Sequence, residues 1–324
     1  MFHLVYNSDD NYFLPTIVSA ASALFHAEDS SKMCIDVLDC GIADDHWMKY
    51  ANLLRKKFPT MGGLIRHRVD NERISKYRSW RGSVATYARI LTPEILSDLD
   101  YCLFVDGDTL FVSDPLELER KYDPQFWIQG SVDYHDGDDR LEQYKSYGLT
   151  LHDDYVCCGF MLMNLQALRL NGFSQKCFDF LDKYNSILSV DQEAINSVTH
   201  GHIAKLDPDW GVFSESGYML NRRPKCWHYV FGKPWLLNIE WTRCLYEFDR
   251  AWFSYARKTL GLGWQDFPQA SRFDYFKRIV TTFCVATVRF ALGNTKWFNS
   301  YFYQGKLTRL FSSLCPFYQV AVNN

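Results

Sequence analysis

The sequence predicts an α/β fold, in which a mainly parallel sheet carries helices on both faces, followed by a helical C-terminal extension. Apolar segments of strand length alternate with amphipathic helical segments, a pattern typical of doubly wound sheets. The chain has 324 residues, 47% of them hydrophobic, enough to bury one large core with a smaller appendage. Because the pattern changes near residue 245, we expect one domain over residues 1–245 and a basic, aromatic-rich helical region over residues 246–324.

The chain begins with a predicted β-α-β unit. Phe2–Tyr6 and Met33–Leu38 have the composition of buried strands. Asn11–Ala27 lies between them and places its large apolar residues on one helical face, which predicts a helix. Pro15 falls within the first turn of this helix, where proline is tolerated.

The alternation continues along the chain. Further helices are predicted at Asp44–Phe58, Val84–Leu96, Phe173–Leu188 and Gln192–Thr199. Further strands are predicted at Gly63–Val69, from Tyr101 to Asp106, at Phe126–Val132 and at Gly159–Leu165. In the segment Val84–Leu96, Pro93 predicts a break or a new helix start.

Two carboxylates, Asp106 and Asp108, stand one residue apart at the end of an apolar run. Hard oxygen donors of this kind suit Mg²⁺ or Mn²⁺ that keeps open positions for substrate phosphates. Gly107 between them allows a tight turn and leaves room for a diphosphate. The alternative is an ordinary Asp-Gly turn after a strand.

The cysteine pattern and the N-terminus indicate a reducing compartment. Ten cysteines are scattered without a CxxC pair, and the adjacent Cys157 and Cys158 do not readily bridge. We therefore expect reduced, mostly packed cysteines and no structural zinc site. The first residues lack a basic segment and a long apolar segment, so we expect no secretory signal and a cytoplasmic location.

Charge is unevenly distributed along the chain. The net charge is −3, but residues 251–324 contain nine Lys or Arg and two Asp, a net of +7, which leaves −10 for residues 1–250. This asymmetry predicts a basic region that meets an anionic membrane surface. A helix is expected at Tyr275–Leu292, whose longest uncharged run, Ile279–Val288, is too short to span a bilayer. The alternative is a C-terminal helix packed on the core.

Six motifs, in order, resemble those of the retaining glycosyltransferases of family 8, especially bacterial enzymes that add hexoses to lipopolysaccharide cores. The resemblance covers about residues 3–240. The motifs are Asn7-Ser-Asp9-Asp10-Asn11-Tyr12, Thr86-Tyr-Ala-Arg89-Ile, Asp106-Gly-Asp108, Tyr155-Val-Cys-Cys-Gly159-Phe-Met-Leu-Met-Asn164-Leu, Asp191-Gln192-Glu-Ala-Ile-Asn196 and His228-Tyr-Val-Phe-Gly232-Lys233-Pro-Trp235. Each motif alone is weak, but all six in the family's order form a specific signal.

The resemblance implies a GT-A type fold and a function. The expected reaction moves a hexose, galactose or glucose, from a UDP-sugar to a saccharide acceptor, an oligosaccharide or glycolipid of lipopolysaccharide or of another cell-surface glycan. Mn²⁺ or Mg²⁺ is the implied cofactor, and no nucleic acid is expected as a partner. Retention permits either a covalent intermediate on a carboxylate or same-face attack by the acceptor. Because Gln192 is a poor nucleophile, a covalent route would use Asp191 or Asp133. We favour same-face attack with a UDP oxygen as the base.

The resemblance also assigns roles to individual residues. The metal would be held by Asp106, Asp108 and His228, a mixed set that favours Mn²⁺. Residues implied to bind the donor are Asp9, Asn11, Tyr12, Arg89, Asp106, Gly107, Asp108, Cys157, Gly232 and Lys233. Residues implied to be catalytic, beside the donor sugar or the acceptor, are Asp191, Gln192 and Asp133.

Each of these positions also has a purely structural interpretation. Asp9, Asp10 and Asn11 are favoured helix-capping residues, and Asp191 suits a helix N-terminus. Arg89 could form an ordinary ion pair on a helix surface, which contributes little to stability. His228 could be a packed, hydrogen-bonded side chain, and Lys233 a solvated loop lysine.

Two features depart from the family pattern. Cys157 stands where the family has Asn, and a thiol cannot replace the paired donor and acceptor of an amide. The loop between His228 and Lys233 is one residue shorter. The cysteine suggests altered sugar preference or weakened activity, so a silent sugar-nucleotide or glycan-binding protein is one alternative. A metal-dependent nucleotidyltransferase is another.

Overall fold

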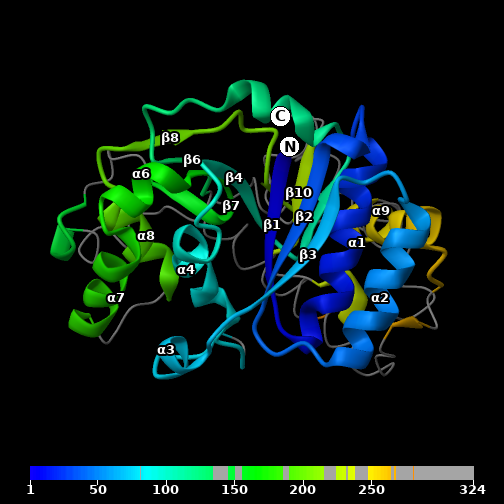
Figure 1. The fold of residues 1–324 in the computed structure, drawn as a ribbon, viewed down its shortest axis with the longest axis horizontal. Helices are drawn as coiled ribbons and strands as arrows, with labels where there is room; N and C mark the ends of the chain where they lie inside the picture. Colours follow the sequence, from blue (N-terminus) through cyan, green and yellow to red (C-terminus); the bar gives the residue numbers. More distant parts are fainter. Residues whose placement is uncertain are drawn as a thin grey trace, which may run out of the picture.

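The computed structural model describes residues 1–80, 82–133, 145–149, 155–184, 190–214, 224–230, 233–237, 247–263, 266–267 and 280. Within them a seven-stranded sheet runs in the order β3-β2-β1-β4-β7-β6-β8 (Figure 1). Its strands are β1 (Phe2–Ser8), β2 (Met33–Asp39), β3 (Gly63–Arg68), β4 (Tyr101–Asp106), β6 (Ile128–Val132), β7 (Val156–Asn164) and β8 (Ile203–Lys205). Strand β7 is antiparallel to both of its neighbours, and the other neighbouring pairs in this sheet are parallel.

Helices cover both faces of this sheet. One face carries α1 (Asp10–His26) and α2 (Asp44–Lys57) (Figure 1). The other carries α4 (Ala88–Ile95), α6 (Leu165–Leu170), α7 (Phe173–Lys183) and α8 (Asp191–Val198), with the short α3 (Glu72–Ser75) at its lower edge. The expected α/β architecture, a mainly parallel sheet with helices on both faces, is therefore confirmed.

Alternation along the strands divides the core into two parts. In β1, Leu4 and Tyr6 belong to the cluster under α1 and α2, whereas Val5 belongs to the cluster under α4 and α7. All three side chains are buried. A strand that is apolar on both faces is expected where helices cover both sides of a parallel sheet.

Two prolines are tolerated deeper inside helices than expected. Helix α1 begins at Asp10, so Pro15 lies in its second turn rather than its first. The predicted break at Pro93 is wrong, because α4 continues through it to Ile95. Arg169 donates hydrogen bonds to the carbonyls of Pro93 at 3.2 Å, Leu96 at 3.2 Å and Leu99 at 2.8 Å, which satisfy carbonyls at and beyond the end of α4.

A second, three-stranded sheet was not expected from the sequence. It consists of β5 (Thr109–Phe111), β10 (Cys226–His228) and β9 (Val212–Phe213), in the order β5-β10-β9. Strand β5 starts directly after Asp108, and its Thr109 pairs with His228 in antiparallel register. This pairing brings residues more than a hundred positions apart to the end of β4.

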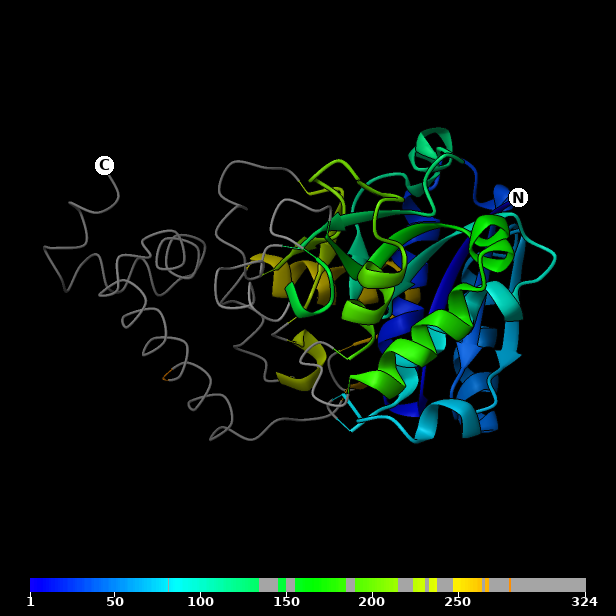
Figure 2. The same cartoon turned by 90° about the vertical axis from the view of Figure 1, so that its left-hand side faces the viewer.

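The described part of the C-terminal region packs on the α/β body. It contains α9 (Glu247–Tyr255) and a π-helical turn, Ala256–Leu260, seen in yellow to orange in Figure 2. Trp252 is fully buried, with its ring 5.1 Å from Trp235 and 5.0 Å from Phe267, and Tyr255 OH lies 2.7 Å from Nε2 of His26.

The remaining C-terminal expectations concern residues that are for the most part not described. The helix expected at Tyr275–Leu292 lies outside the described residues, apart from Val280. Across the described ranges, no helix combines the length and apolar character needed to cross a membrane. The seven described cysteines are all buried and free of disulfide bonds.

Candidate active site

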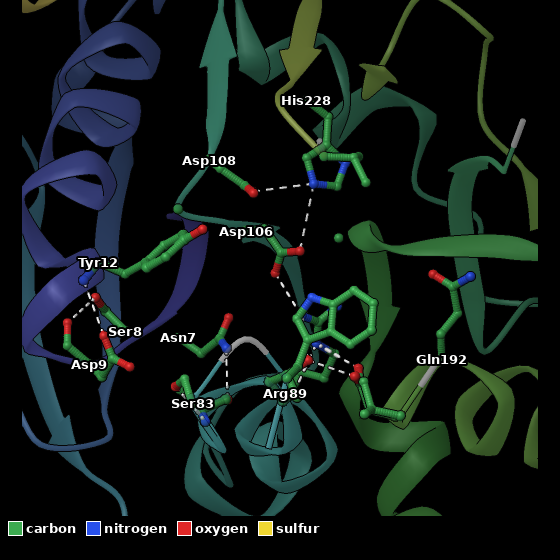
Figure 3. A pocket seen from close by; sticks show the side chains of 18 of the residues that line it. Asn7, Ser8, Asp9, Tyr12, Ser83, Arg89, Asp106, Asp108, Gln192 and His228 are labelled. Carbon is green, nitrogen blue, oxygen red and sulfur yellow. Dashed lines mark hydrogen bonds and ion pairs between the residues drawn. The ribbon is translucent and has the colours of Figure 1, made fainter. Parts of the chain in front are cut away.

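A cavity of about 460 Å³ opens where β1 and β4 end. Its walls come from segments far apart in the sequence, including the N-terminus of α1, the α4 region, β7, α8 and β10 (Figure 3). Thirteen of the predicted site residues line it, namely Asp9, Asn11, Tyr12, Arg89, Asp106, Gly107, Asp108, Asp133, Cys157, Asp191, Gln192, His228 and Lys233. Gly232 lies outside the described residues.

Asp106, Asp108 and His228 form a cluster that could hold a metal ion. Their ligand atoms all lie within 4.8 Å of one another. Nε2 of His228 is 3.2 Å from Oδ1 of Asp108 and 3.7 Å from Oδ2 of Asp106, and Figure 3 shows the three side chains converging. Oδ1 of Asp108 is buried and accepts no hydrogen bond from the described residues. Buried oxygen atoms of this kind suit a cation ligand.

Glycine lets these ligands converge. A Cβ on Gly159 would lie 2.3 Å from Cε1 of His228 and 2.6 Å from Oδ2 of Asp106. A Cβ on Gly107 would lie 2.2 Å from Oγ1 of Thr16. Gly159 therefore lets the Asp106 carboxylate and the imidazole approach, and Gly107 lets the turn between the two carboxylates pack against Thr16 of α1.

The charges within this cluster compensate one another. Burial would raise the pKa of Asp108, but Lys233 and His228 hold it well below its usual range. Burial raises the pKa of Asp106, with Arg89 opposing the shift and Asp108 adding to it. Burial would lower the pKa of His228, but the Asp108 carboxylate raises it to about 10.

Lys233 is a buried cation rather than a solvated loop residue. Its side chain is 5% exposed, and its ammonium contacts a carboxylate oxygen of Asp108 and the carbonyl of Tyr229. It also donates to the carbonyl of Val230 at 3.2 Å. The shortened loop therefore still delivers a positive charge to the metal-ligand cluster.

Arg89 connects this cluster to the opposite wall of the cavity. Its Nη2 lies 2.7 Å from Oδ1 of Asp106, and its Nε lies 2.9 Å from Oδ2 of Asp191. Thr86 donates to the other oxygen of Asp191 at 2.6 Å. Burial raises the pKa of Asp191 while Arg89 and Thr86 oppose the shift. Arg89 is thus a buried bridge between two carboxylates, and not a surface ion pair.

Gln192 and Asp133 form a second polar group beside Asp191. Nε2 of Gln192 donates to Oδ2 of Asp133 at 2.6 Å, and its Oε1 accepts from the backbone N–H of Cys158 at 3.1 Å. Both the nitrogen and the oxygen of the Gln192 amide are thus hydrogen-bonded, which fixes the amide at the N-terminus of α8.

The N-terminal motif combines structural and cavity-facing roles. Asp9 caps α1 by accepting from the backbone N–H of Tyr12 at 3.1 Å, and it also lines the cavity. Asp10 instead accepts from the backbone N–H of Ala43 at 2.9 Å and contacts His46. The capping interpretation therefore applies to Asp9, where it coexists with a place in the cavity wall.

Cys157, the main departure from the family pattern, lies against the metal-ligand cluster. Its sulfur is 3.8 Å from Nδ1 of His228 and the residue is 5% exposed. A thiol at this position contacts the imidazole on the side away from Asp108.

Comparison with known proteins identifies the family. The model of glycosyl transferase family 8 matches residues 3–238. The chain belongs to glycosyl transferase family 8.

Similar proteins agree with this membership. A Haemophilus influenzae protein described as a presumed glycosyltransferase is 28% identical over 123 residues, 37% of each chain. The galactosyltransferase LgtC, solved with donor and acceptor sugar analogues, superposes with a TM-score of 0.70 at 21% identity, covering 81% of this chain and 98% of LgtC. The bifunctional glycosyltransferase WbbM superposes with a TM-score of 0.64 at 19% identity, and the match covers 80% of this chain and 50% of WbbM. These structural likenesses show the GT-A fold.

Several residues that build the site of this family 8 chain were not predicted as site residues. Thr86 stands one helical turn before Arg89, a spacing that could have drawn attention to it. Gly159 meets Asp106 only because β7 runs antiparallel beside β4 with Val105 opposite Phe160. Trp80 and Ser83 line the cavity from a loop without a recognisable pattern.

Gly159→Ala should weaken metal binding without unfolding the protein. The new methyl group would displace His228 and Asp106, and disturbances of ligand position typically reduce metal affinity by about 10–100-fold. Titration of Mn²⁺ by electron paramagnetic resonance measures the effect. Cys158→Ala, on the neighbouring residue of β7 whose side chain belongs to the α4 and α7 cluster, is the matched control and should bind as the wild type. Wild-type affinity in Gly159→Ala would contradict the ligand assignment.

Proposed function

We propose that this protein is a metal-dependent hexosyltransferase that moves galactose or glucose from a UDP-sugar to a saccharide hydroxyl with retention of configuration. The observation that supports it most is the Arg89 bridge, which joins the Asp106 carboxylate to Asp191 at 2.7 and 2.9 Å. A metal-ligand cluster and a buried carboxylate on opposite walls of one cavity suit the two halves of a sugar nucleotide. The diphosphate would lie at the first and the sugar at the second.

The metal would be held by Asp106, Asp108 and His228. The buried Oδ1 of Asp108, which faces Nε2 of His228 at 3.2 Å, and the space left by Gly159 fit such an ion. A mixed carboxylate and imidazole set favours Mn²⁺ over Mg²⁺. When bound, the metal would neutralise charge that develops on the diphosphate leaving group.

Lys233 would provide the second positive charge for the leaving group. Its ammonium is already inside the cavity wall, so little reorganisation is needed when a diphosphate binds. A buried lysine acts as a compact point charge. Asp9, Asn11 and Tyr12, at the start of α1, would contact the nucleoside.

The contacts of Asp191 favour same-face attack over a covalent intermediate. Its Oδ1 accepts a hydrogen bond from Thr86, and its Oδ2 lies in an ion pair 2.9 Å from Nε of Arg89. An oxygen held by a strong donor is a weak nucleophile. Asp133 is similarly held by Gln192 at 2.6 Å. Asp191 would then stabilise positive charge at the anomeric carbon while an oxygen of the departing UDP accepts the acceptor's proton.

The acceptor and the location form a further part of the proposal. An oligosaccharide or glycolipid of lipopolysaccharide, or of another cell-surface glycan, would be extended at the cytoplasmic face of the membrane. The basic C-terminal region would then bring the cavity close to lipid-borne acceptors by contacting anionic lipid.

A panel of UDP-sugars with Mn²⁺, scored for hydrolysis without acceptor, tests the function. One UDP-hexose should be hydrolysed to UDP in a metal-dependent manner, and Asp108→Asn should reduce the rate by at least about 10²-fold because a charged ligand is lost. Asp182→Asn, which alters an exposed carboxylate paired with Lys76, is the control and should retain activity. Formation of UTP and hexose 1-phosphate when pyrophosphate is added to the UDP-sugar would instead indicate a nucleotidyltransferase. Donor binding without turnover on any acceptor would indicate a silent binding protein.

Asp191→Asn should lower kcat by about 10²-fold or more while changing the KM for the donor little, because its proposed role is at the reacting sugar carbon. Thr86→Val should give a smaller loss of kcat, since Asp191 keeps its Arg89 contact. Thr86→Ser retains the hydroxyl and is the matched control. Steady-state kinetics with the preferred donor measures both constants, and a loss confined to KM would contradict the placement of Asp191 at the sugar.

Removal of residues 268–324 should abolish salt-sensitive binding to anionic vesicles. This truncation leaves α9 and its packing on the body intact while it deletes seven Lys or Arg and Asp274, a net of +6. Each basic residue near the surface contributes about 1 kcal/mol. Co-sedimentation measures binding. Full-length protein that carries Lys277→Gln, Arg278→Gln and Arg289→Gln should bind to an intermediate extent. Equal sedimentation of full-length and folded truncated protein would exclude a membrane role for the region.

A further inference from the structure

A polar cluster lies on the sheet away from the cavity. His3 of β1 and Cys34 of β2 are partners in the parallel register, and Asp36 stands two residues further along β2 on the same face. His67 of β3 shares this face, because the register pairs Leu38 with His67. The alternate residues Leu4 and Ile35 point to the opposite face, toward α1 and α2. None of the four polar residues lines the active-site cavity.

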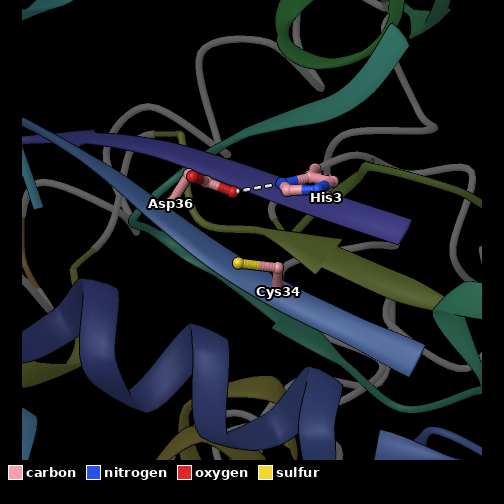
Figure 4. A group of neighbouring side chains, drawn as sticks. All are labelled: His3, Cys34 and Asp36. Atoms are coloured by element: carbon pink, nitrogen blue, oxygen red, sulfur yellow. Dashed lines mark hydrogen bonds and ion pairs between the residues drawn. The ribbon is translucent and has the colours of Figure 1, made fainter. Parts of the chain in front are cut away.

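The donor atoms of this cluster converge on one point. Ligand atoms of His3, Cys34 and Asp36 lie within 4.8 Å of one another. Nδ1 of His3 is 2.7 Å from Oδ2 of Asp36, and Nε2 of His67 is 2.8 Å from the other oxygen. Figure 4 shows the imidazole and the carboxylate facing each other with the Cys34 sulfur beside them.

Burying these polar groups costs free energy unless a ligand or strong pairing between them compensates. Asp36 is 1% exposed and Cys34 is 3% exposed. Burial would raise the pKa of Asp36, but the hydrogen bonds with His3 and His67 outweigh it and lower the pKa. The carboxylate is therefore kept as an anion inside a sheet whose neighbouring positions are apolar, which is unusual for the inner strands of a parallel sheet.

Nitrogen, sulfur and oxygen donors are the atom types that zinc binds in proteins. Zn²⁺ binds imidazole, thiolate and carboxylate at about 2.0–2.3 Å, so its tetrahedral ligands stand about 3.3–3.8 Å apart. To share the ion, Nδ1 of His3 and Oδ2 of Asp36 would exchange their 2.7 Å hydrogen bond for contacts to the metal and move apart to this spacing. The expectation of no structural zinc site rested on the absence of CxxC spacing, a signal that fails when the ligands come from two neighbouring strands.

We propose that His3, Cys34 and Asp36 bind Zn²⁺ through Nδ1, Sγ and Oδ2. His67 is a positioning residue, because its hydrogen bond to Oδ1 orients the carboxylate toward the ion. The His3 side chain is 15% exposed and the His67 side chain 22%, which gives the ion access from solvent and leaves a fourth position for water. On binding, the Cys34 thiol loses its proton to solvent and becomes the thiolate ligand.

Such an ion would tie β2 to β1, whose carboxyl end lines the cavity. Asp9 and the start of α1 follow β1 directly. The zinc site would therefore stabilise the frame of the active site without taking part in its chemistry, independently of whether the proposed transferase activity is correct.

Cobalt spectroscopy and thermal unfolding test this site in the full-length protein. Co²⁺ added to metal-free wild type should give the charge-transfer band of a cobalt–thiolate bond, and Zn²⁺ should abolish that band by competition. Zn²⁺ at a hundredfold excess over Kd should raise Tm by about 3–6 °C. Cys34→Ala should lose the band. Cys157→Ala, which removes the thiol beside His228, is the matched control and should retain it.

His3→Gln provides a second variant in case Cys34→Ala is unstable. It removes an imidazole that is partly exposed while it keeps a hydrogen-bonding group, and it should weaken Zn²⁺ binding at least tenfold as measured by competition with a chromophoric chelator. Absence of the thiolate band in the wild type, or an unchanged band in Cys34→Ala, would overturn the proposal. The cluster would then be a buried carboxylate paired with two imidazoles.

Discussion

The buried guanidinium of Arg89 is the interaction on which the arrangement of the cavity depends. It is 5% exposed and lies between Asp106 at the end of β4 and Asp191 at the start of α8. Removing one partner from such a buried ion pair typically costs about 3–5 kcal/mol, because an uncompensated charge remains. Arg89 therefore fixes the distance between the metal-ligand cluster and the carboxylate at the opposite wall. Its own position depends on α4, whose end is held by Arg169.

A second constraint is the crossing of the small sheet over the end of β4. Pairing of Thr109 with His228 brings the imidazole to the two carboxylates, and the antiparallel course of β7 places Gly159 against them. Four segments thus meet where a single extra methyl group would cause a collision. Close packing therefore keeps the geometry of these ligands fixed, although they come from distant parts of the chain.

Local patterns predicted β1, α1 and β2 well, because their periodicity follows directly from which side chains are buried, but α3 and α6 were missed and β7 begins at Val156 rather than Gly159. The strands β5 and β10 have three residues each, too few to show an alternation of apolar and polar side chains. The direction of β7 depends on partners elsewhere in the chain. The carbonyl of Pro93 in α4 likewise accepts a hydrogen bond from a distant residue, Arg169.

For the site, motif residues at strand and helix ends were found from the sequence, since that is where open sheets expose polar groups. Thr86 and Gly159 were missed because their importance comes from what they touch. The His3, Cys34 and Asp36 cluster was missed for the same reason, as only the strand register brings its members together.

The central claim is that Asp106, Asp108 and His228 hold the metal that accompanies the nucleotide. Crystals grown with UDP and Mn²⁺ and measured at the manganese absorption edge test it most directly. The account predicts one anomalous peak within bonding distance of all three side chains and of the diphosphate, with Lys233 on the phosphate oxygens. A nucleotide bound in the cavity with no manganese peak at these three residues would contradict it.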